Sequence, residues 1–283
     1  MERHITHPDE LTRPFVRPAL MGILNVTEDS FSDGGLFLDP ESAIQHGTSL
    51  LAAGADIIDI GAASSNISSI RVDTETEIRR LESVMEPLKL RGAVLSVDSF
   101  NPDVQLFALS RGADILNDIQ GFPDSRIYDQ LAASGCRLVV MHSVQRIGPA
   151  TSVDVNPEIV LQEVFDFFLE RIKSLTAAGI SESRLILDPG MGFFLGSNPQ
   201  ASFSVLKSLR KIKSFFNMPI LVSVSRKSFL RLGSSRPVGE RGSATLAAEI
   251  YCAYSGVDYI RTHDVRAAVD AFEVLGAIHS NGK

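Results

Sequence analysis

Three side chains of this sequence suit a flat heterocyclic ligand, and each stands at the end of a short apolar run. They are Asp98, Asn117 and Asp188. An asparagine amide offers both a donor and an acceptor, and a carboxylate accepts paired N–H bonds from a guanidine-like edge. Together these residues predict a site for a planar ligand that bears amide and amino groups.

Cationic side chains follow the two apolar runs nearest the C-terminus. Arg226 and Lys227 stand after the run at 220–224, next to Ser225, and Arg261 and His263 stand after the run at 259–260. In barrels of alternating strands and helices, a phosphate site often forms after the last two strands. The sequence therefore predicts a ligand that combines a heterocycle with a phosphate group.

The apolar runs themselves predict the fold. Most are continuous rather than alternating, which is typical of strands buried on both faces of a parallel sheet. Eight strands alternating with helices predict a single closed (β/α)8 TIM barrel of the α/β class rather than an open sheet. Helical patterns include 41–53, 75–90, 157–178, 200–216 and 243–255. The predicted strands are 19–24, 56–60, 93–97, 114–116, 137–141, 185–187, 220–224 and 259–260.

Local signals mark where the helices begin and end. A capping residue followed by proline predicts a helix start, and a glycine after a helix predicts a left-handed C-cap. Gly54, Gly112 and Gly256 each begin a Gly-x-Asp turn that leads into the next strand. The start signals are Asp39-Pro40, Asn101-Pro102, Asn156-Pro157 and Asn198-Pro199.

The predicted barrel brings the polar residues together, because active sites of this fold lie at the carboxyl ends of the strands. A cap or turn explains one polar residue at a strand end, whereas polar residues at all eight ends favour a shared site. The glycine-rich segment 32–35 is either a turn or a mobile loop that covers the ligand. The residues expected at this rim are Asn25, Ser64, Ser65, Asp98, Asn117, Asp118, His142, Asp188, Ser225, Arg226, Lys227, Arg261 and His263.

Composition sets further limits. The chain has 283 residues, a net charge of −7 and a hydrophobic fraction of 44%, which suits one barrel domain at 19–283. Residues 1–18 are expected to form a loose extension without the apolar core of a secretory signal. The acidic balance argues against nucleic-acid binding, and no apolar stretch reaches the roughly 18 residues of a membrane helix. Cys136 and Cys252 are far apart, which favours buried thiols in a reducing cytoplasm.

Six segments form recognisable motifs, and in this order and at this spacing they closely resemble the dihydropteroate synthases. The match runs from about residue 20 to the C-terminus, and the motifs are highly specific when taken together. The segments are Met21-Gly22-Ile23-Leu24-Asn25-Val26-Thr27-Glu28-Asp29-Ser30-Phe31-Ser32-Asp33-Gly34-Gly35, Val97-Asp98-Ser99, Leu116-Asn117-Asp118-Ile119, Leu187-Asp188-Pro189-Gly190-Met191-Gly192-Phe193, Ser225-Arg226-Lys227-Ser228-Phe229 and Ile260-Arg261-Thr262-His263-Asp264.

The resemblance implies a transferase of folate biosynthesis that joins a dihydropterin methyl diphosphate to 4-aminobenzoate and releases diphosphate. It implies that Asn25 binds Mg2+ and the diphosphate, and that Ser65 supplies a hydroxyl group nearby. Arg261 and His263 would also bind the diphosphate, while Ser225 and Arg226 would border the aminobenzoate site. The pterin would be held by Asp98, Asn117, Asp188 and Lys227, and the catalytic residues would be Asp98, Lys227, Arg261 and His263.

Two loops depart from the common family pattern. Where the family usually has Gly-Gly-Glu-Ser-Thr-Arg-Pro-Gly, segment 61–68 carries Asn66 in place of the arginine. After the sixth strand, Gly-Phe-Gly-Lys is replaced by a longer loop that contains Phe193 and Phe194. These departures resemble the mobile, sulfonamide-resistant branch of the family. We expect Phe193 and Phe194 to crowd the aminobenzoate pocket against a sulfonamide. The alternative is that Phe194 packs in the core.

The expected mechanism relies on positioning and electrostatic stabilisation rather than covalent catalysis. The resemblance also implies a homodimer, with the helix at 243–255 as a candidate contact. Two other functions stay open: a pterin-dependent methyltransferase barrel, and a pterin-binding protein without catalytic activity.

Overall fold

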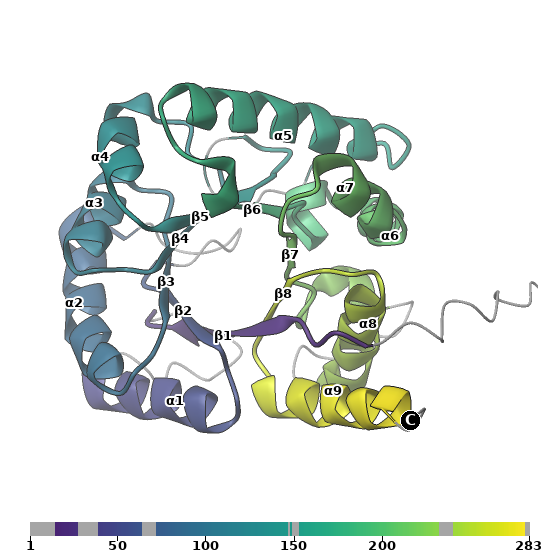
Figure 1. Cartoon of the computed structure of the whole chain (residues 1–283), viewed down its shortest axis with the longest axis horizontal. Coiled ribbons are helices and arrows are strands. Elements are labelled where there is room, and N and C mark those ends of the chain that lie inside the picture. Colours follow the sequence, from purple (N-terminus) through teal and green to yellow (C-terminus); the bar gives the residue numbers. More distant parts are fainter. Residues whose placement is uncertain are drawn as a thin grey trace, which may run out of the picture.

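Eight parallel strands form a ring in this protein, and helices surround it (Figure 1). The computed structural model describes residues 15–27, 39–63, 72–146, 148, 153–231 and 240–280. The strand order is β6-β5-β4-β3-β2-β1-β8-β7, and a parallel bridge between Leu187 and Ile220 joins the two ends of the sheet. The predicted (β/α)8 barrel is confirmed. The strands are β1 (Ala19–Asn25), β2 (Ile57–Gly61), β3 (Leu95–Asp98), β4 (Ile115–Asp118), β5 (Arg137–Met141), β6 (Leu185–Asp188), β7 (Leu221–Val222) and β8 (Tyr259–Thr262).

Several strands run further than the apolar pattern predicted. The backbone ladder continues after the apolar residues end, so that Asp98 pairs with Asn117 and Met141 pairs with Asp188. The polar residues at these positions therefore belong to the strands rather than to the loops after them. In contrast, β7 is shorter than the predicted 220–224.

The helices follow the predicted pattern with two differences. The pattern at 200–216 divides at Ser208, whose hydroxyl donates to the carbonyl of Ser204 at 2.9 Å and whose ψ of 3° leaves the helical range. The helix predicted from 157 begins at Val160, because residues 157–159 form a turn. The helices are α1 (Pro40–Ala52), α2 (Thr74–Leu90), α3 (Pro102–Ser110), α4 (Tyr128–Ala133), α5 (Val160–Ala177), α6 (Pro199–Lys207), α7 (Leu209–Phe216), α8 (Gly242–Tyr254) and α9 (Val265–Ser280).

Three of the predicted helix starts are confirmed as N-caps. The side chains of Asp39, Asn101 and Asn198 accept hydrogen bonds from backbone N–H groups of the first turn, and proline follows each of them. The predicted left-handed glycines are confirmed as well, with φ of 99° at Gly54 and 83° at Gly256. These signals fix where the chain leaves each helix and returns to the barrel.

The Gly-x-Asp turns do more than connect a helix to a strand. In each one the aspartate carboxylate accepts the backbone N–H group at the start of a neighbouring strand, which would otherwise lack a partner in the ladder. The turns thus secure the amino-terminal end of the barrel, opposite the predicted site. The bonds join Asp56 to Leu20 at 2.7 Å, Asp114 to Leu95 at 2.9 Å, and Asp258 to Ile220 at 2.7 Å.

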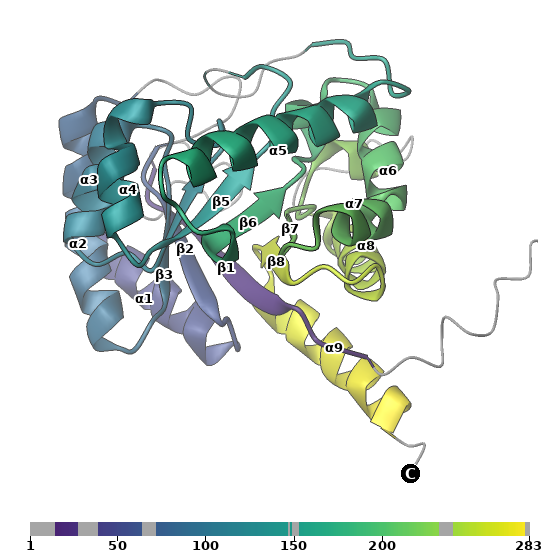
Figure 2. The ribbon, with the colours of Figure 1, turned by 45° about the horizontal axis from the view of Figure 1, so that its top comes forward.

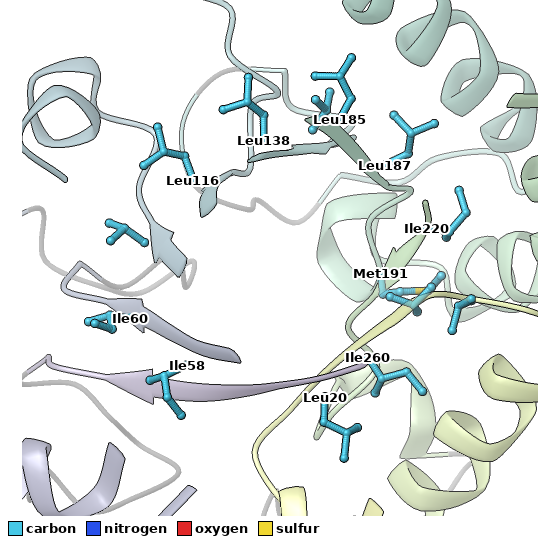
Figure 3. Close-up of a cluster of buried hydrophobic side chains, with 14 of the residues drawn as sticks. Leu20, Ile58, Ile60, Leu116, Leu138, Leu185, Leu187, Met191, Ile220 and Ile260 are labelled. Atoms are coloured by element: carbon cyan, nitrogen blue, oxygen red, sulfur yellow. The ribbon is translucent and has the colours of Figure 1, made fainter. Parts of the chain in front are cut away.

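The two faces of the strands have different roles, because successive side chains point to opposite sides. Outward residues such as Leu116, Leu138 and Ile260 belong to the main core between the barrel and the helices, and they lie around the ring rather than in its middle (Figure 3). Inward residues of the amino-terminal half fill the barrel. They are Met21, Ile57, Ile115, Val139, Ile186 and Leu221.

The division into an extension at 1–18 and a barrel domain at 19–283 stays a prediction, since residues 1–14 lie outside the described part. Residues 15–18 lead into β1 alongside α9 (Figure 2). Phe15 packs on Phe272 and His279 of α9, and Arg17 pairs with Asp56 at 2.8 Å. Among the described helices, none is long and apolar enough to cross a membrane.

Both cysteines are unpaired and buried, as the sequence favoured. Burial raises the pKa of the Cys136 thiol to about 12 and raises the pKa of the Cys252 thiol still further. Neither thiol is a reactive thiolate near neutral pH.

Candidate active site

The barrel brings the predicted site residues of the strands to one rim. Asn25, Asp98 and Asn117 lie at one level, because Asn25 and Asp98 both pair with Gly61, and Asp98 pairs with Asn117. Asp188 is the last residue of β6, and Arg261 lies one residue before the end of β8. Both side chains point inward. Above the apolar interior, therefore, the inward positions become polar and charged.

An ion-pair cluster lies at the centre of this rim. The Arg261 guanidinium donates from Nε to Asp59 Oδ2 at 2.6 Å and from Nη2 to Asp98 Oδ2 at 2.8 Å. Asp59 is fully buried, one layer deeper in β2. Because an isolated charge costs several kcal/mol to bury, each of these three groups depends on the others. Asp59 is a site residue that sequence reasoning missed.

The same cluster sets the protonation of Asp98. Burial raises the pKa of Asp98 to about 7, while Arg261 opposes this shift and Asp59 adds to it. Arg261 in turn has its pKa raised above the usual value by Asp59 and Asp98, which outweigh its burial. Its guanidinium uses two of five N–H groups in these contacts, so others are left for a ligand oxygen.

Asn117 and Asp188 supply further polar groups around the cluster. Asn117 is buried and donates to Asp59 at 3.4 Å, while its Oδ1 has no hydrogen-bond partner in the described part of the chain. Asp188 accepts the Gly190 N–H at 2.8 Å, and burial raises the pKa of its carboxyl to about 6. An unused buried acceptor costs about 1–3 kcal/mol, so Asn117 Oδ1 is suited to accept a donor from a bound ligand.

Lys227 approaches the rim from the turn after β7. Its ammonium donates to the Met191 carbonyl at 3.2 Å and lies 4.7 Å from the ring centroid of Phe194. A side chain at Gly192 would meet Lys227 at 3.1 Å, so the glycine leaves room for the lysine to pass. Burial lowers the pKa of Lys227 to about 8, and Asp188 opposes the shift. Lys227 is therefore mostly charged at neutral pH.

Ser225 and His263 meet at the last two strands. Ser225 Oγ lies 2.9 Å from His263 Nδ1 and accepts the His263 backbone N–H at 3.2 Å. Burial, with help from Arg226 and Arg261, lowers the pKa of His263 to about 3, so its ring is neutral. Arg226 has a left-handed φ of 58°, and its backbone N–H donates to Thr245 Oγ1 at 3.1 Å. The first turn of α8 thus holds this turn in place.

The two phenylalanines after β6 lie in the short helix η4 (Gly192–Leu195). Phe194 is 9% exposed and packs with Ile119 and Met141 in a small cluster apart from the main core. Phe193 is 38% exposed. The loop is tied to the segment after β5, because Val144 N donates to Phe194 O at 2.9 Å and Gln145 Nε2 donates to Phe193 O at 3.1 Å.

Two polar strand-end residues have structural roles. Asp118 accepts hydrogen bonds from the backbone of Gln120 and Phe122, and so shapes the loop after β4. His142 is buried against Phe167, and its Nδ1 lies 3.3 Å from the Pro189 carbonyl oxygen. Ser64, Ser65, Asn66 and the glycine-rich segment 32–35 lie outside the described residues.

Asn25 stands at the rim beside Gly61 and Asp98. A side chain at Gly61 would come within 3.4 Å of Asn25 Oδ1 and 3.9 Å of Asp98, so the glycine keeps the space between them open. Among the described residues, no three His, Cys, Asp or Glu side chains are grouped to hold a metal ion.

The fold and this rim define a barrel enzyme with a buried, charged site suited to a nitrogen-rich ring and an anionic group. The model of the family described as "Pterin binding enzyme" matches residues 21–263. The chain is 51% identical to dihydropteroate synthase type-3 of Escherichia coli (92% of this chain, 98% of that one) and 48% identical to dihydropteroate synthase type-2 of the same species (93% and 97%). It also matches a structure of Xanthomonas albilineans dihydropteroate synthase with 4-aminobenzoic acid, with a TM-score of 0.83, 36% identity, and coverage of 93% of this chain and 94% of that one. This chain belongs to the dihydropteroate synthases of the pterin-binding family, and it is a transferase.

Replacing Asp59 with asparagine should lower kcat/KM by roughly ten- to hundredfold, the equivalent of losing one hydrogen bond to a charged group. The substitution keeps the shape of the side chain but removes the charge that holds Arg261. Steady-state kinetics of the purified variant measure this. Asp56→Asn, just outside the amino-terminal end of the same strand, is the matched control and should retain wild-type kcat/KM. Equal kinetics in both variants would exclude a site role for Asp59.

Proposed function

We propose that the rim condenses a dihydropterin methyl diphosphate with 4-aminobenzoate, and that the charged cluster around Arg261 carries the reaction. Asp98, Asn117, Asp188 and Lys227 hold the pterin, whose amino and amide groups complement their acceptors and donor. The supporting observation is the ion-pair cluster at the strand ends, which joins the fully buried Asp59 and the partly buried Asp98 through Arg261. The Xanthomonas albilineans relative binds 4-aminobenzoic acid in its solved structure, which supports this second substrate.

In the proposed reaction, the arylamine nitrogen forms a bond to the pterin methylene carbon while the bond from that carbon to the diphosphate oxygen breaks. The diphosphate leaves with the electron pair, and the new secondary amine loses one proton. Arg261 and His263 donate hydrogen bonds to the departing anion. The ionised form of Asp98 stabilises positive charge that develops on the pterin. These groups are fixed before the reaction, so they contribute by preorganisation.

Mg2+ is proposed as the cation of the diphosphate, with Asn25 as its protein ligand. The donor set fits, because Mg2+ prefers oxygen ligands, keeps several waters and is commonly bound through substrate phosphates with few protein groups. Asn25 presents an amide oxygen at the rim next to the open space at Gly61. When bound, the ion would neutralise charge on the leaving diphosphate. Ser225 and Arg226 border the aminobenzoate, and Ser65 would supply a hydroxyl near the diphosphate.

Asp98→Ala and Lys227→Ala should each lower turnover by orders of magnitude while the fold stays intact. The first removes the carboxylate beside the pterin, and the second removes the ammonium that faces Asp188. Diphosphate release with 4-aminobenzoate measures turnover, and circular dichroism measures folding. Asp129→Ala, on the exposed side of α4, is the control. Wild-type turnover in either site variant would contradict the proposed roles.

The loop after β6 is proposed to exclude sulfonamides. Phe193 is exposed next to the rim, and Phe194 faces Lys227 and closes a small apolar cluster. A planar carboxylate fits beside them, whereas the tetrahedral sulfur and added ring of a sulfonamide would clash. Discrimination of this kind depends on a repulsive element as well as an attractive one. The proposal makes this enzyme a source of sulfonamide resistance.

Phe193→Ala should make the enzyme at least about tenfold more sensitive to sulfamethoxazole, because relief of a clash is worth about 1.4 kcal/mol or more. The KM for 4-aminobenzoate should change little. The inhibition constant of the purified variant measures the effect. Phe215→Ala, at an exposed phenylalanine of α7, is the matched control, and sulfamethoxazole should inhibit it as it inhibits the wild type. Micromolar inhibition of the unmodified enzyme would defeat the proposal.

A homodimer and a cytoplasmic location are also proposed. Exposed apolar side chains on the packed helices α8 and α9, namely Tyr251, Val274 and Ile278, support a contact between two copies. Sedimentation equilibrium giving the mass of a single chain would contradict the dimer. The two unpaired, buried cysteines suit a reducing compartment, and cell fractionation tests the location.

A further inference from the structure

Phe193 differs from its neighbour Phe194 in how its side chain is held. Phe194 is buried and packs with Ile119 and Met141, whereas Phe193 is 38% exposed and belongs to no buried cluster of the described residues. A clash between a ligand and a wall costs no more than it costs to move the wall aside, so a wall that discriminates must be supported by other groups. For Phe193 this support has to come through the backbone.

The backbone carbonyl oxygen of Phe193 accepts two hydrogen bonds. Gly196 N donates to it at 3.1 Å and closes the turn of η4. Gln145 Nε2, from the segment after β5, donates to it at 3.1 Å as well. The next carbonyl, that of Phe194, accepts the Val144 N–H at 2.9 Å. Both lone pairs of the Phe193 oxygen are therefore used, and one of the two bonds depends on a side chain.

Gln145 is itself oriented as a donor toward Phe193. The hydroxyl of the buried Ser143 donates to Gln145 Oε1 at 2.5 Å, so the amide NH2 group is turned to the Phe193 carbonyl. Arg146 N donates to Ser143 O at 3.1 Å and closes this turn. The Arg146 guanidinium lies 4.8 Å from the ring centroid of Phe167 in α5. The group that holds Phe193 is thus anchored to the helix layer of the barrel.

The other end of the loop is fastened further along the chain after β5. Ser197 donates to the Val153 carbonyl oxygen from its backbone N–H at 2.7 Å and from its hydroxyl at 3.1 Å. Gly196 has a φ of 102°, and a side chain there would come within 2.9 Å of the same oxygen. The loop after β6 is therefore attached at both ends, and Phe193 lies at the end that Gln145 holds.

We propose that Gln145 is a positioning residue for inhibitor discrimination, because its amide donor fixes the backbone of Phe193 and keeps the loop from yielding to a larger ligand. Ser143 acts through Gln145 by orienting that amide. The inference rests on the exclusion of sulfonamides proposed above and adds the residue that enforces it.

The two ligands should respond differently to loss of this hydrogen bond. A planar 4-aminobenzoate fits beside Phe193 in its held position, so its binding does not require the loop to move. A sulfonamide binds only when Phe193 moves away, and its affinity therefore includes the cost of breaking the bond from Gln145. Removing the bond should favour the sulfonamide alone.

Gln145→Leu tests this, because leucine removes the donor without adding charge or much changing the size of the side chain. The inhibition constant of sulfamethoxazole should fall by about two- to tenfold, the factor that corresponds to one neutral hydrogen bond. The KM for 4-aminobenzoate and kcat should not change. Gln145→Lys, which keeps a donor on a long side chain, should restore most of the wild-type inhibition constant. Gln162→Leu, at an exposed glutamine of α5, is the matched control and should match the wild type.

Hydrogen exchange of the substrate-free enzyme gives a second measurement that involves no inhibitor. In Gln145→Leu, the amides of residues 192–197 should exchange roughly two- to tenfold faster, because local opening of the loop no longer breaks this bond. Ser143→Ala should act in the same direction with a smaller effect. The amides of β6, which belong to the sheet, should exchange at the wild-type rate.

Unchanged exchange of residues 192–197 in Gln145→Leu overturns the inference. Faster exchange with an unchanged ratio of the sulfamethoxazole inhibition constant to the KM for 4-aminobenzoate overturns it too. Micromolar inhibition of the unmodified enzyme has another meaning: it rejects the proposed exclusion of sulfonamides, whereas the exchange rates still decide whether Gln145 holds the loop.

Discussion

The ion pairs of Arg261 with the buried Asp59 and the partly buried Asp98 are the constraint on which the rest of the site depends. Burial and the charge of Asp59 raise the pKa of Asp98, while both carboxylates raise the pKa of Arg261. The guanidinium between them compensates their negative charges. Removing one partner of a buried pair typically costs about 3–5 kcal/mol, because it leaves the other charge without compensation. The rim is therefore one electrostatic unit and not a set of independent ligands.

The barrel makes this unit possible by giving each charged group a separate strand. Neighbouring strands in register hold Asn25, Asp98 and Asn117 at a single level, where backbone hydrogen bonds fix their positions. Glycines provide the space: a side chain at Gly190 would come within 2.4 Å of the His142 carbonyl oxygen, which would force the loop after β6 to move. Rigid strands thus carry the charges, and short turns without side chains let the loops approach them.

The sequence predicted most of this rim because its polar residues interrupt apolar runs. Asp98, Asn117, Asp188 and Arg261 could be found in that way, and the strands and most helices followed from the same runs. Asp59 could not, because it lies inside a continuous apolar run, and only the register shows that it faces the interior. The break at Ser208 was missed for a similar reason: a local bond to Ser204 competes with the helix, and periodicity does not register it.

The separation between strands and loops also explains how the proposed discrimination against sulfonamides could change without loss of the proposed pterin site. The cradle of Asp59, Asp98, Asn117 and Arg261 is built from β2, β3, β4 and β8, whose geometry is set by the sheet. Phe193 and Phe194 belong to a loop that contacts the segment after β5 through two backbone carbonyl groups. A loop can gain length or bulk at little cost to the fold. Lys227 links the two parts, because its ammonium contacts both the Met191 carbonyl and the ring of Phe194. Added bulk at this loop therefore has to leave that ammonium in place.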